Sequence, residues 1–223
     1  MQNRQSTRGN AVFLVLIAMA LFAALAYAMT SGFRGGSGPT QEQSRLAAAE
    51  MIQYGNGLRI IMDKMMLMGG ASDTNIFFAA TGAHADYGVV GAQAATEIFH
   101  PSGGGAVYQA PPPEACLVVP CAYEFTGQYR INDVGNNFDK RELTMFVRNI
   151  PKSVCKGVNK ILQPGWTGIP NGGSGALALV RFTGSYTAGS TLSLSASLTG
   201  KRAFCFFEDS TTGYVYLHVL RAR

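Results

Sequence analysis

The feature that most constrains this chain is an apolar run near its N-terminus. From Ala11 to Met29 there are 19 residues without a charged or strongly polar side chain. A helix of about 20 such residues matches the hydrocarbon thickness of a membrane. Two arginines in the preceding leader, Arg4 and Arg8, favour a cytoplasmic N-terminus and transfer of the rest of the chain across the membrane. We therefore expect a transmembrane or assembly helix over residues 10–31, located in the inner membrane, with the C-terminal domain exported to the periplasm or cell surface.

Three interpretations of this N-terminal segment are open. A secretory signal peptide would be cleaved after the small-x-small sequence Ala26-Tyr27-Ala28, although the apolar run is longer than the 7–15 residues usual in such peptides. An uncleaved membrane anchor is the second interpretation. The third depends on Gly9, which stands between the short basic leader and the apolar run, followed by Asn10.

A short basic leader, a glycine and then an uninterrupted apolar helix resemble the prepilin-type leader of type IV pilins and pseudopilins. The resemblance implies that a prepilin peptidase cleaves after Gly9 and that Asn10 becomes the new N-terminus. It also implies that the apolar helix is retained on the mature chain. The sequence departs from the family at the fifth mature position, where Leu14 stands in place of the usual glutamate. Some minor pseudopilins lack this glutamate as well.

A break and a second helix follow the apolar run. Residues 32–39 are rich in glycine and end in a proline, so they predict a hinge, because both residues are costly inside a helix. Thr40 and Gln43 then have the spacing of a capping box. Apolar residues recur at helical spacing up to the glycines at 69–70, which predicts an amphipathic helix over residues 41–68. The expected organisation is a leader at 1–9, the apolar helix at 10–31, the hinge at 32–39 and a globular pilin-like domain at 40–223.

The C-terminal half contains segments typical of β-strands. Thr191–Leu198 alternates between apolar and polar residues, and the segments that begin at Ala203 and Tyr214 are rich in aromatic and β-branched residues. The segment that begins at Ala176 is a further candidate, and Tyr123–Ile131 is a candidate edge strand. Short turns between these segments favour an antiparallel meander.

A short helix is expected within residues 149–165, with Pro151 at its first position and Cys155 on its apolar face. The strand-like segment before it, together with this helix, resembles the C-terminal part of type IVb pilins. The expected fold class is therefore α+β and pilin-like: an N-terminal apolar membrane or assembly helix, a hinge, and a second amphipathic helix packed on an antiparallel β-sheet.

The chain has four cysteines, an even number that agrees with disulfide bonding in an oxidising compartment. Three pairings are possible, and we favour Cys116 with Cys121 and Cys155 with Cys205. A metal site is the alternative, but the first two cysteines are separated by four residues, unlike the shorter spacing of zinc ribbons, and no histidine is near them in the sequence. We therefore expect no metal and no cofactor.

Candidate catalytic groups are few. His84, Asp86 and His100 lie in glycine-rich segments, where lone histidines are usually structural or exposed. No nucleophile elbow, P-loop or paired-carboxylate pattern is present. We expect that the chain is not an enzyme. Beyond Gly9 the chain carries 16 basic and 13 acidic side chains, an excess too small to indicate nucleic-acid binding.

The function that this resemblance implies is that of a minor pilin or pseudopilin, a subunit of a type IV pilus or of a type II secretion-like filament. Its expected partners are other pilin or pseudopilin subunits, the prepilin peptidase and the inner membrane, and no small-molecule substrate is identified. The alternative is an exported, membrane-tethered periplasmic ligand-binding protein or enzyme, with its site in the loops of residues 72–115.

Overall fold

The computed structural model describes residues 13–24, 40–118, 121–135, 141–172, 180–186, 198–208 and 213–223. The chain divides into two compact units, Met1–Gly38 and Pro39–Arg223. The described part of the first unit is one helix, over residues 13–24. The second unit is α+β, with a four-stranded antiparallel sheet.

The membrane-spanning helix expected over residues 10–31 is not found. Helical residues 13–24 extend about 18 Å at 1.5 Å per residue, whereas a bilayer core is about 30 Å thick. Within the described ranges no helix combines the length and the apolar character needed to cross a membrane. The predicted inner-membrane location, and the membrane part of the predicted fold class, are therefore wrong. Gly9, Asn10 and the hinge at 32–39 lie outside the described residues, so leader cleavage stays a prediction.

The second predicted helix is confirmed as α2, which spans Gln41–Met68. Its capping box forms as expected: the Gln43 N–H donates to Thr40 Oγ1 over 3.2 Å, and the Thr40 N–H donates to Gln43 Oε1 over 2.9 Å. The helix ends at Gly69, whose N–H donates to the Met65 carbonyl. These contacts satisfy backbone groups that would otherwise lack partners at the helix ends.

The sheet has the strand order β1-β2-β4-β3. Its strands are β1 (Glu124–Thr126), β2 (Leu143–Ile150), β3 (Ala203–Phe207) and β4 (Tyr214–Arg221). The strands expected from Ala203 and Tyr214 are therefore confirmed, and β1 is an edge strand as expected but occupies only three residues of the predicted segment.

Two other predicted strands have a different outcome. Of Thr191–Leu198 only the last residue is described, so this prediction is not tested. Residues 180–182, the described end of the segment that begins at Ala176, are not a strand. This segment instead makes isolated contacts with β1: the Phe182 N–H donates to the Phe125 carbonyl, and Thr126 Oγ1 donates to the Val180 carbonyl.

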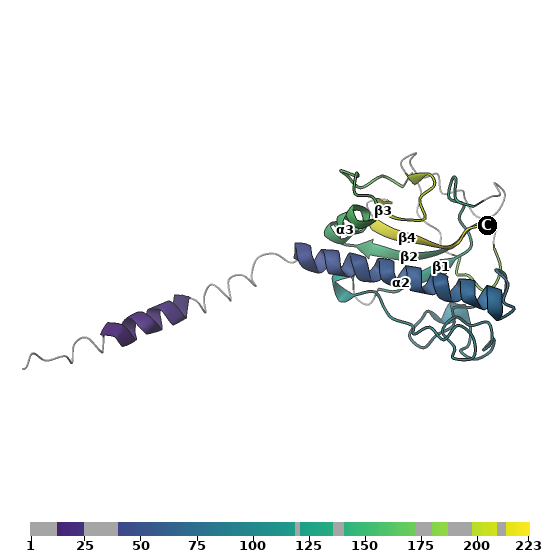
Figure 1. Ribbon diagram of the computed structural model, residues 1–223, viewed down its shortest axis with the longest axis horizontal. Coiled ribbons are helices and arrows are strands. Elements are labelled where there is room, and N and C mark those ends of the chain that lie inside the picture. The colour runs from purple at the N-terminus through teal and green to yellow at the C-terminus, as the bar shows by residue number, and fades with distance from the viewer. Residues whose placement is uncertain are drawn as a thin grey trace, which may run out of the picture. The chain divides into compact units, whose positions relative to one another are not determined.

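Both faces of the sheet are covered. Figure 1 shows α2 lying across one face, with α3 (Lys152–Leu162) beside it. Alternate residues of β4 supply the two cores: Tyr216 and Leu220 belong to the helix side, whereas Val215, Leu217 and Val219 pack on the opposite side. The second core also contains Tyr129, Ile131, Val134, Phe146, Leu198, Phe204 and Phe206. The sheet is thus a buried central layer.

Helix α3 is fastened to the edge strand β3. Its N-cap is Pro151, so the helix starts one residue later than predicted. The Cys155–Cys205 disulfide joins the helix to the middle of β3. One turn along, the Asn159 side chain donates to the Cys205 carbonyl and accepts from the Cys205 N–H, both over 2.8 Å. These contacts cover polar groups of an edge strand that could otherwise pair with another chain.

Candidate functional site

The helix at residues 13–24 is apolar on all its sides. All twelve of its residues are exposed and none carries a polar side chain. Its large side chains, which we call the apolar helix surface, are Phe13, Leu14, Val15, Leu16, Ile17, Met19, Leu21 and Phe22. A helix that is apolar all round is normally buried against something, so this surface is the clearest candidate for an interaction in the described chain.

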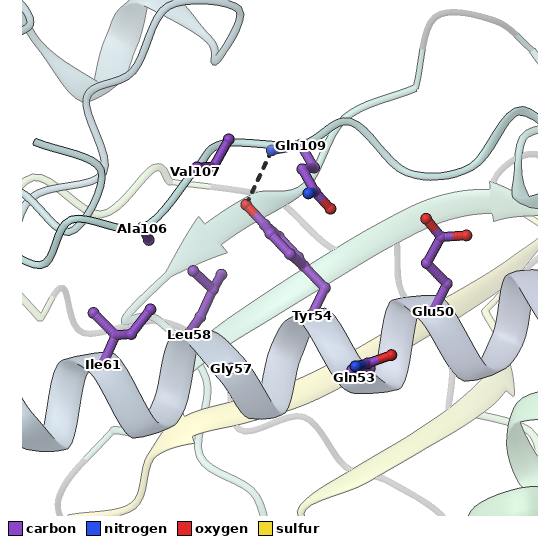
Figure 2. A pocket seen from close by; sticks show the side chains of 9 residues that line it. All are labelled: Glu50, Gln53, Tyr54, Gly57, Leu58, Ile61, Ala106, Val107 and Gln109. Carbon is purple, nitrogen blue, oxygen red and sulfur yellow. Dashed lines mark hydrogen bonds between the residues drawn. The ribbon is translucent and has the colours of Figure 1, made fainter.

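A groove in the larger unit is the second candidate site (Figure 2). It lies between α2 and the segment of residues 106–109 and has a volume of about 380 Å³. The α2 side contributes Glu50, Gln53, Tyr54, Gly57, Leu58 and Ile61, and the facing segment contributes Ala106, Val107 and Gln109. Figure 2 shows Leu58 and Ile61 opposite Ala106 and Val107. One end of the groove is therefore apolar and the other end is polar.

Tyr54 closes the middle of this groove. Its hydroxyl accepts a hydrogen bond from the Gln109 N–H over 3.3 Å, and its ring stacks on Tyr123 with 4.6 Å between the centroids. Burial raises the pKa of Tyr54 to about 12, so the phenol is neutral at ordinary pH. Among the described lining residues Glu50 is the only carboxylate, and none is a histidine or a cysteine. The arrangement suits binding of a partly apolar group and offers no acid–base pair.

The loops at 72–115 are organised around a buried carboxylate. Glu97 is 1% exposed and accepts hydrogen bonds from the N–H groups of Gly91 and Gln93, both over 2.9 Å. The Phe77 carbonyl accepts from the Ile98 N–H, and these contacts hold the loop without regular strands. Sequence analysis did not identify Glu97, because nothing in its neighbourhood distinguishes a buried glutamate from an exposed one.

The predicted candidate histidines have local contacts. His84 Nδ1 accepts from the Asp86 N–H, and Asp86 is paired with Arg181 over 2.8 Å. His100 Nδ1 accepts from the Ser102 N–H over 3.1 Å. Each imidazole thus stabilises a turn of its own segment, and neither lines the groove of Figure 2.

The four cysteines form two disulfides, and the favoured pairing is confirmed. Cys116 is bonded to Cys121 and Cys155 to Cys205, with Cα–Cα distances of 5.8 and 5.3 Å. In the part of the chain that the structure describes, no three metal-ligating side chains from histidine, cysteine, aspartate or glutamate are grouped closely enough to hold an ion. The expected absence of a metal stays a prediction.

The groove was not predicted from the sequence. The helical spacing of Tyr54, Leu58 and Ile61, at i, i+4 and i+7, is a signal that they share a face of α2. The facing segment 106–109 has no comparable signal, because it is held by contacts between residues far apart in the sequence. Its link to α2, between Tyr54 and Gln109, joins residues 55 positions apart.

Comparisons with protein-family models, with curated proteins and with solved structures find no match for this chain.

Proposed function

We propose that the chain is a structural or interaction subunit of an exported filament, of the minor pilin or pseudopilin kind, and that it assembles through its apolar helix surface. The observation that carries the proposal is that every residue of this all-apolar helix, 13–24, is exposed. Full burial of one large apolar side chain contributes about 1.5–3 kcal/mol. Several such side chains on one helix therefore provide a strong drive to pack against copies of the chain or related subunits.

Two features of the larger unit support export and assembly. Its two disulfides suit an oxidising compartment outside the cytoplasm. An amphipathic α2 on an antiparallel sheet gives a rigid body on which an N-terminal assembly helix can be carried. The proposal includes cleavage after Gly9 by a prepilin peptidase, which would leave Asn10 at the start of the mature chain and keep the apolar helix on it.

A second candidate function is ligand binding by the exported domain. The groove of Figure 2 favours it, since a cavity of about 380 Å³ with one apolar and one polar end can hold a small molecule. Filling this groove by Gly57→Leu, at a lining residue where an added Cβ has nothing within 4 Å, separates the two functions. A subunit that acts through its apolar helix surface keeps its assembly after this change, whereas a ligand-binding protein loses its ligand.

Site-specific photo-crosslinking in an exporting host tests the proposal. A photoreactive residue is placed at Leu16, on the apolar helix surface, and in a control chain at Leu67, an exposed α2 residue. We expect adducts with the same chain or with pilin-related chains from position 16 only, and an intact mass that starts at Asn10. Absence of protein adducts from position 16, or a mass that starts at Met29, would contradict the proposal.

A further inference from the structure

A second cavity lies where four parts of the larger unit meet. It has a volume of about 290 Å³. The polar part of its wall comes from Asn56 and Arg59 on α2, Gln163 at the end of α3, Lys201 and Arg202 before β3, and His218 on β4. We call it the basic pocket. It is distinct from the groove of Figure 2, since the two share none of their described lining residues.

The basic pocket has a positively charged lining. Arg59, Lys201 and Arg202 line it, and none of its described lining residues is an aspartate or a glutamate. Among the described residues, no carboxylate forms an ion pair with any of these three cations. The Arg59 Nε is buried and has no hydrogen-bond partner there. Three cations that line one cavity without a carboxylate among its described lining residues favour an anion there.

The fold brings these cations together through two fixed contacts. Gly200 adopts a φ of 73° in the turn before β3, and its N–H donates to the Asn132 carbonyl over 2.7 Å. This turn places Lys201 and Arg202 just ahead of Ala203, which is the register partner of His218. On the other side, Gly55 of α2 packs directly on the His218 ring, which brings Arg59, one turn further along α2, to the same place.

His218 forms a neutral part of the wall. Its Nδ1 shares a hydrogen bond of 2.8 Å with the Tyr216 hydroxyl. Burial, together with the nearby Arg59 charge, lowers the pKa of His218 to about 4. The imidazole therefore adds no further positive charge at neutral pH. The carbonyl end of α3, at Gln163, contributes about half a negative charge, and Asp133 lies beside the lining residue Gly200, so together they offset part of the charge of the three cations.

We propose that the basic pocket binds a small molecule or ion that carries an oxyanion group of at least two negative charges, such as a phosphate or a polycarboxylate. A guanidinium can donate two parallel hydrogen bonds to such a group, and a lysine supplies a mobile point charge. The side-chain amides of Asn56 and Gln163 supply further donors. The volume suits a small anion and leaves no room for a folded partner. This site does not depend on the proposed assembly function.

Isothermal titration calorimetry of the full, disulfide-bonded chain at low salt tests this site. The probes are inorganic phosphate, citrate and, as a separate arm, a sulfated polysaccharide. Lys201→Gln and Arg59→Gln remove pocket cations, and Lys156→Gln is the matched control, since Lys156 is an exposed cation of α3 that does not line the pocket. Arg202→Gln replaces Arg59→Gln if the latter fails to fold.

We expect phosphate or citrate to bind the wild-type chain and the Lys156→Gln variant equally. Each pocket variant should bind at least about tenfold more weakly, because hydrogen bonds to charged groups are the strong ones. The affinity should also fall as sodium chloride is added. Binding of neither small anion, binding of the polysaccharide alone, or equal weakening by Lys156→Gln would each overturn the proposal.

Discussion

Two glycines of α2, Gly55 and Gly57, have opposite surroundings although they are two residues apart. A Cβ added at Gly55 would lie 2.7 Å from His218 Nδ1, whereas one added at Gly57 would have nothing within 4 Å. The His218 ring has little freedom to move, because Tyr216 holds it by a hydrogen bond. The packing of α2 on β4 therefore requires a glycine at one position only.

These glycines give a paired prediction. Gly57→Ala should stabilise the domain by about 0.5–1 kcal/mol, since alanine is the better helix former. Gly55→Ala should destabilise it by up to about 2.5 kcal/mol, because overpacking costs about 1–3 kcal/mol and the same helical gain offsets only about 0.5–1 kcal/mol of it. Urea unfolding of both variants measures the two free energies. Equal effects at the two positions would show that α2 does not approach His218 as closely as described.

Glu142 is a buried carboxyl that titrates near neutral pH. Burial raises its pKa to about 7, and the hydrogen bond from the Ile131 N–H (2.8 Å) only partly offsets this effect. The folded chain therefore favours the protonated carboxyl. The pKa of Glu142 in the folded chain lies above its ordinary value of 4.5. The protonated carboxyl therefore contributes its full share to the free energy of unfolding below pH 4.5, and this contribution is lost as the pH rises through about 7.

Glu142→Gln should remove this pH dependence, since glutamine resembles the protonated acid at every pH. Relative to the variant, the wild-type chain should lose up to about 3 kcal/mol of unfolding free energy between pH 5 and pH 8. Urea unfolding at both pH values measures the difference, and the exposed Glu114→Gln is the control. If the free energies of unfolding of wild type and Glu142→Gln differ by the same amount at pH 5 and at pH 8, the raised pKa of Glu142 is contradicted.

At the scale of elements, the two disulfides differ in what they join and in the length of the loop that they close. Cys155–Cys205 ties α3 to β3 across 50 residues, whereas Cys116–Cys121 closes a loop with a separation of 5. Loop-closure entropy gives about 4 kcal/mol for the long link and about 2 kcal/mol for the short one. Replacing both cysteines of each pair by alanine should therefore cost more stability for the long link. Thermal unfolding of the two double variants compares them, and a larger loss from Cys116 and Cys121 would refute this ranking.

Elements with local signals could be predicted from the sequence, and those fixed by distant contacts could not. The bounds of α2 followed from Thr40, Gln43 and Gly69, which act within one turn of the helix ends. The strand predicted from Ala176 failed over its described end, because a run of apolar residues does not show whether a partner strand is available. The prediction of a membrane helix from the apolar run failed for a related reason. Composition shows that a segment is apolar but does not fix the length of its helix, and the described helix is 12 residues long.

The same contrast applies to the sites of the whole molecule. The cysteine pairing could be predicted, because four cysteines allow only three pairings. The helical pattern also places Cys155 on the apolar face of α3, where it meets Cys205 of β3. The basic pocket could not, since Arg59 and Lys201 are brought together by packing of α2 on β4 and by the turn at Gly200. No spacing in the sequence encodes that approach. The apolar helix surface could be predicted only in part. Its apolar composition is evident in the sequence, but the exposure of its side chains is known only from the structure.

The whole-molecule proposal makes a prediction about assembly. Leu16 is 61% exposed and lies in the first unit, outside Pro39–Arg223, so Leu16→Lys should leave the unfolding of the larger unit unchanged. In an assembled state the same position is buried, and the loss of its burial costs about 2 kcal/mol, which weakens subunit association roughly 30-fold. The matched control is Leu67→Lys, since Leu67 is 85% exposed on α2 and should tolerate the charge in both states.

Sedimentation of the exported, processed chain compares the two lysine variants with wild type. The expected result is a loss of the assembled fraction for Leu16→Lys alone, with equal urea midpoints for all three chains. If Leu16→Lys assembles as wild type does and Leu67→Lys does not, the contact surface lies on the globular unit. In that case the exposed apolar side chains of residues 13–24 are not what holds the subunits together, and the assembly role has to be reassigned to α2.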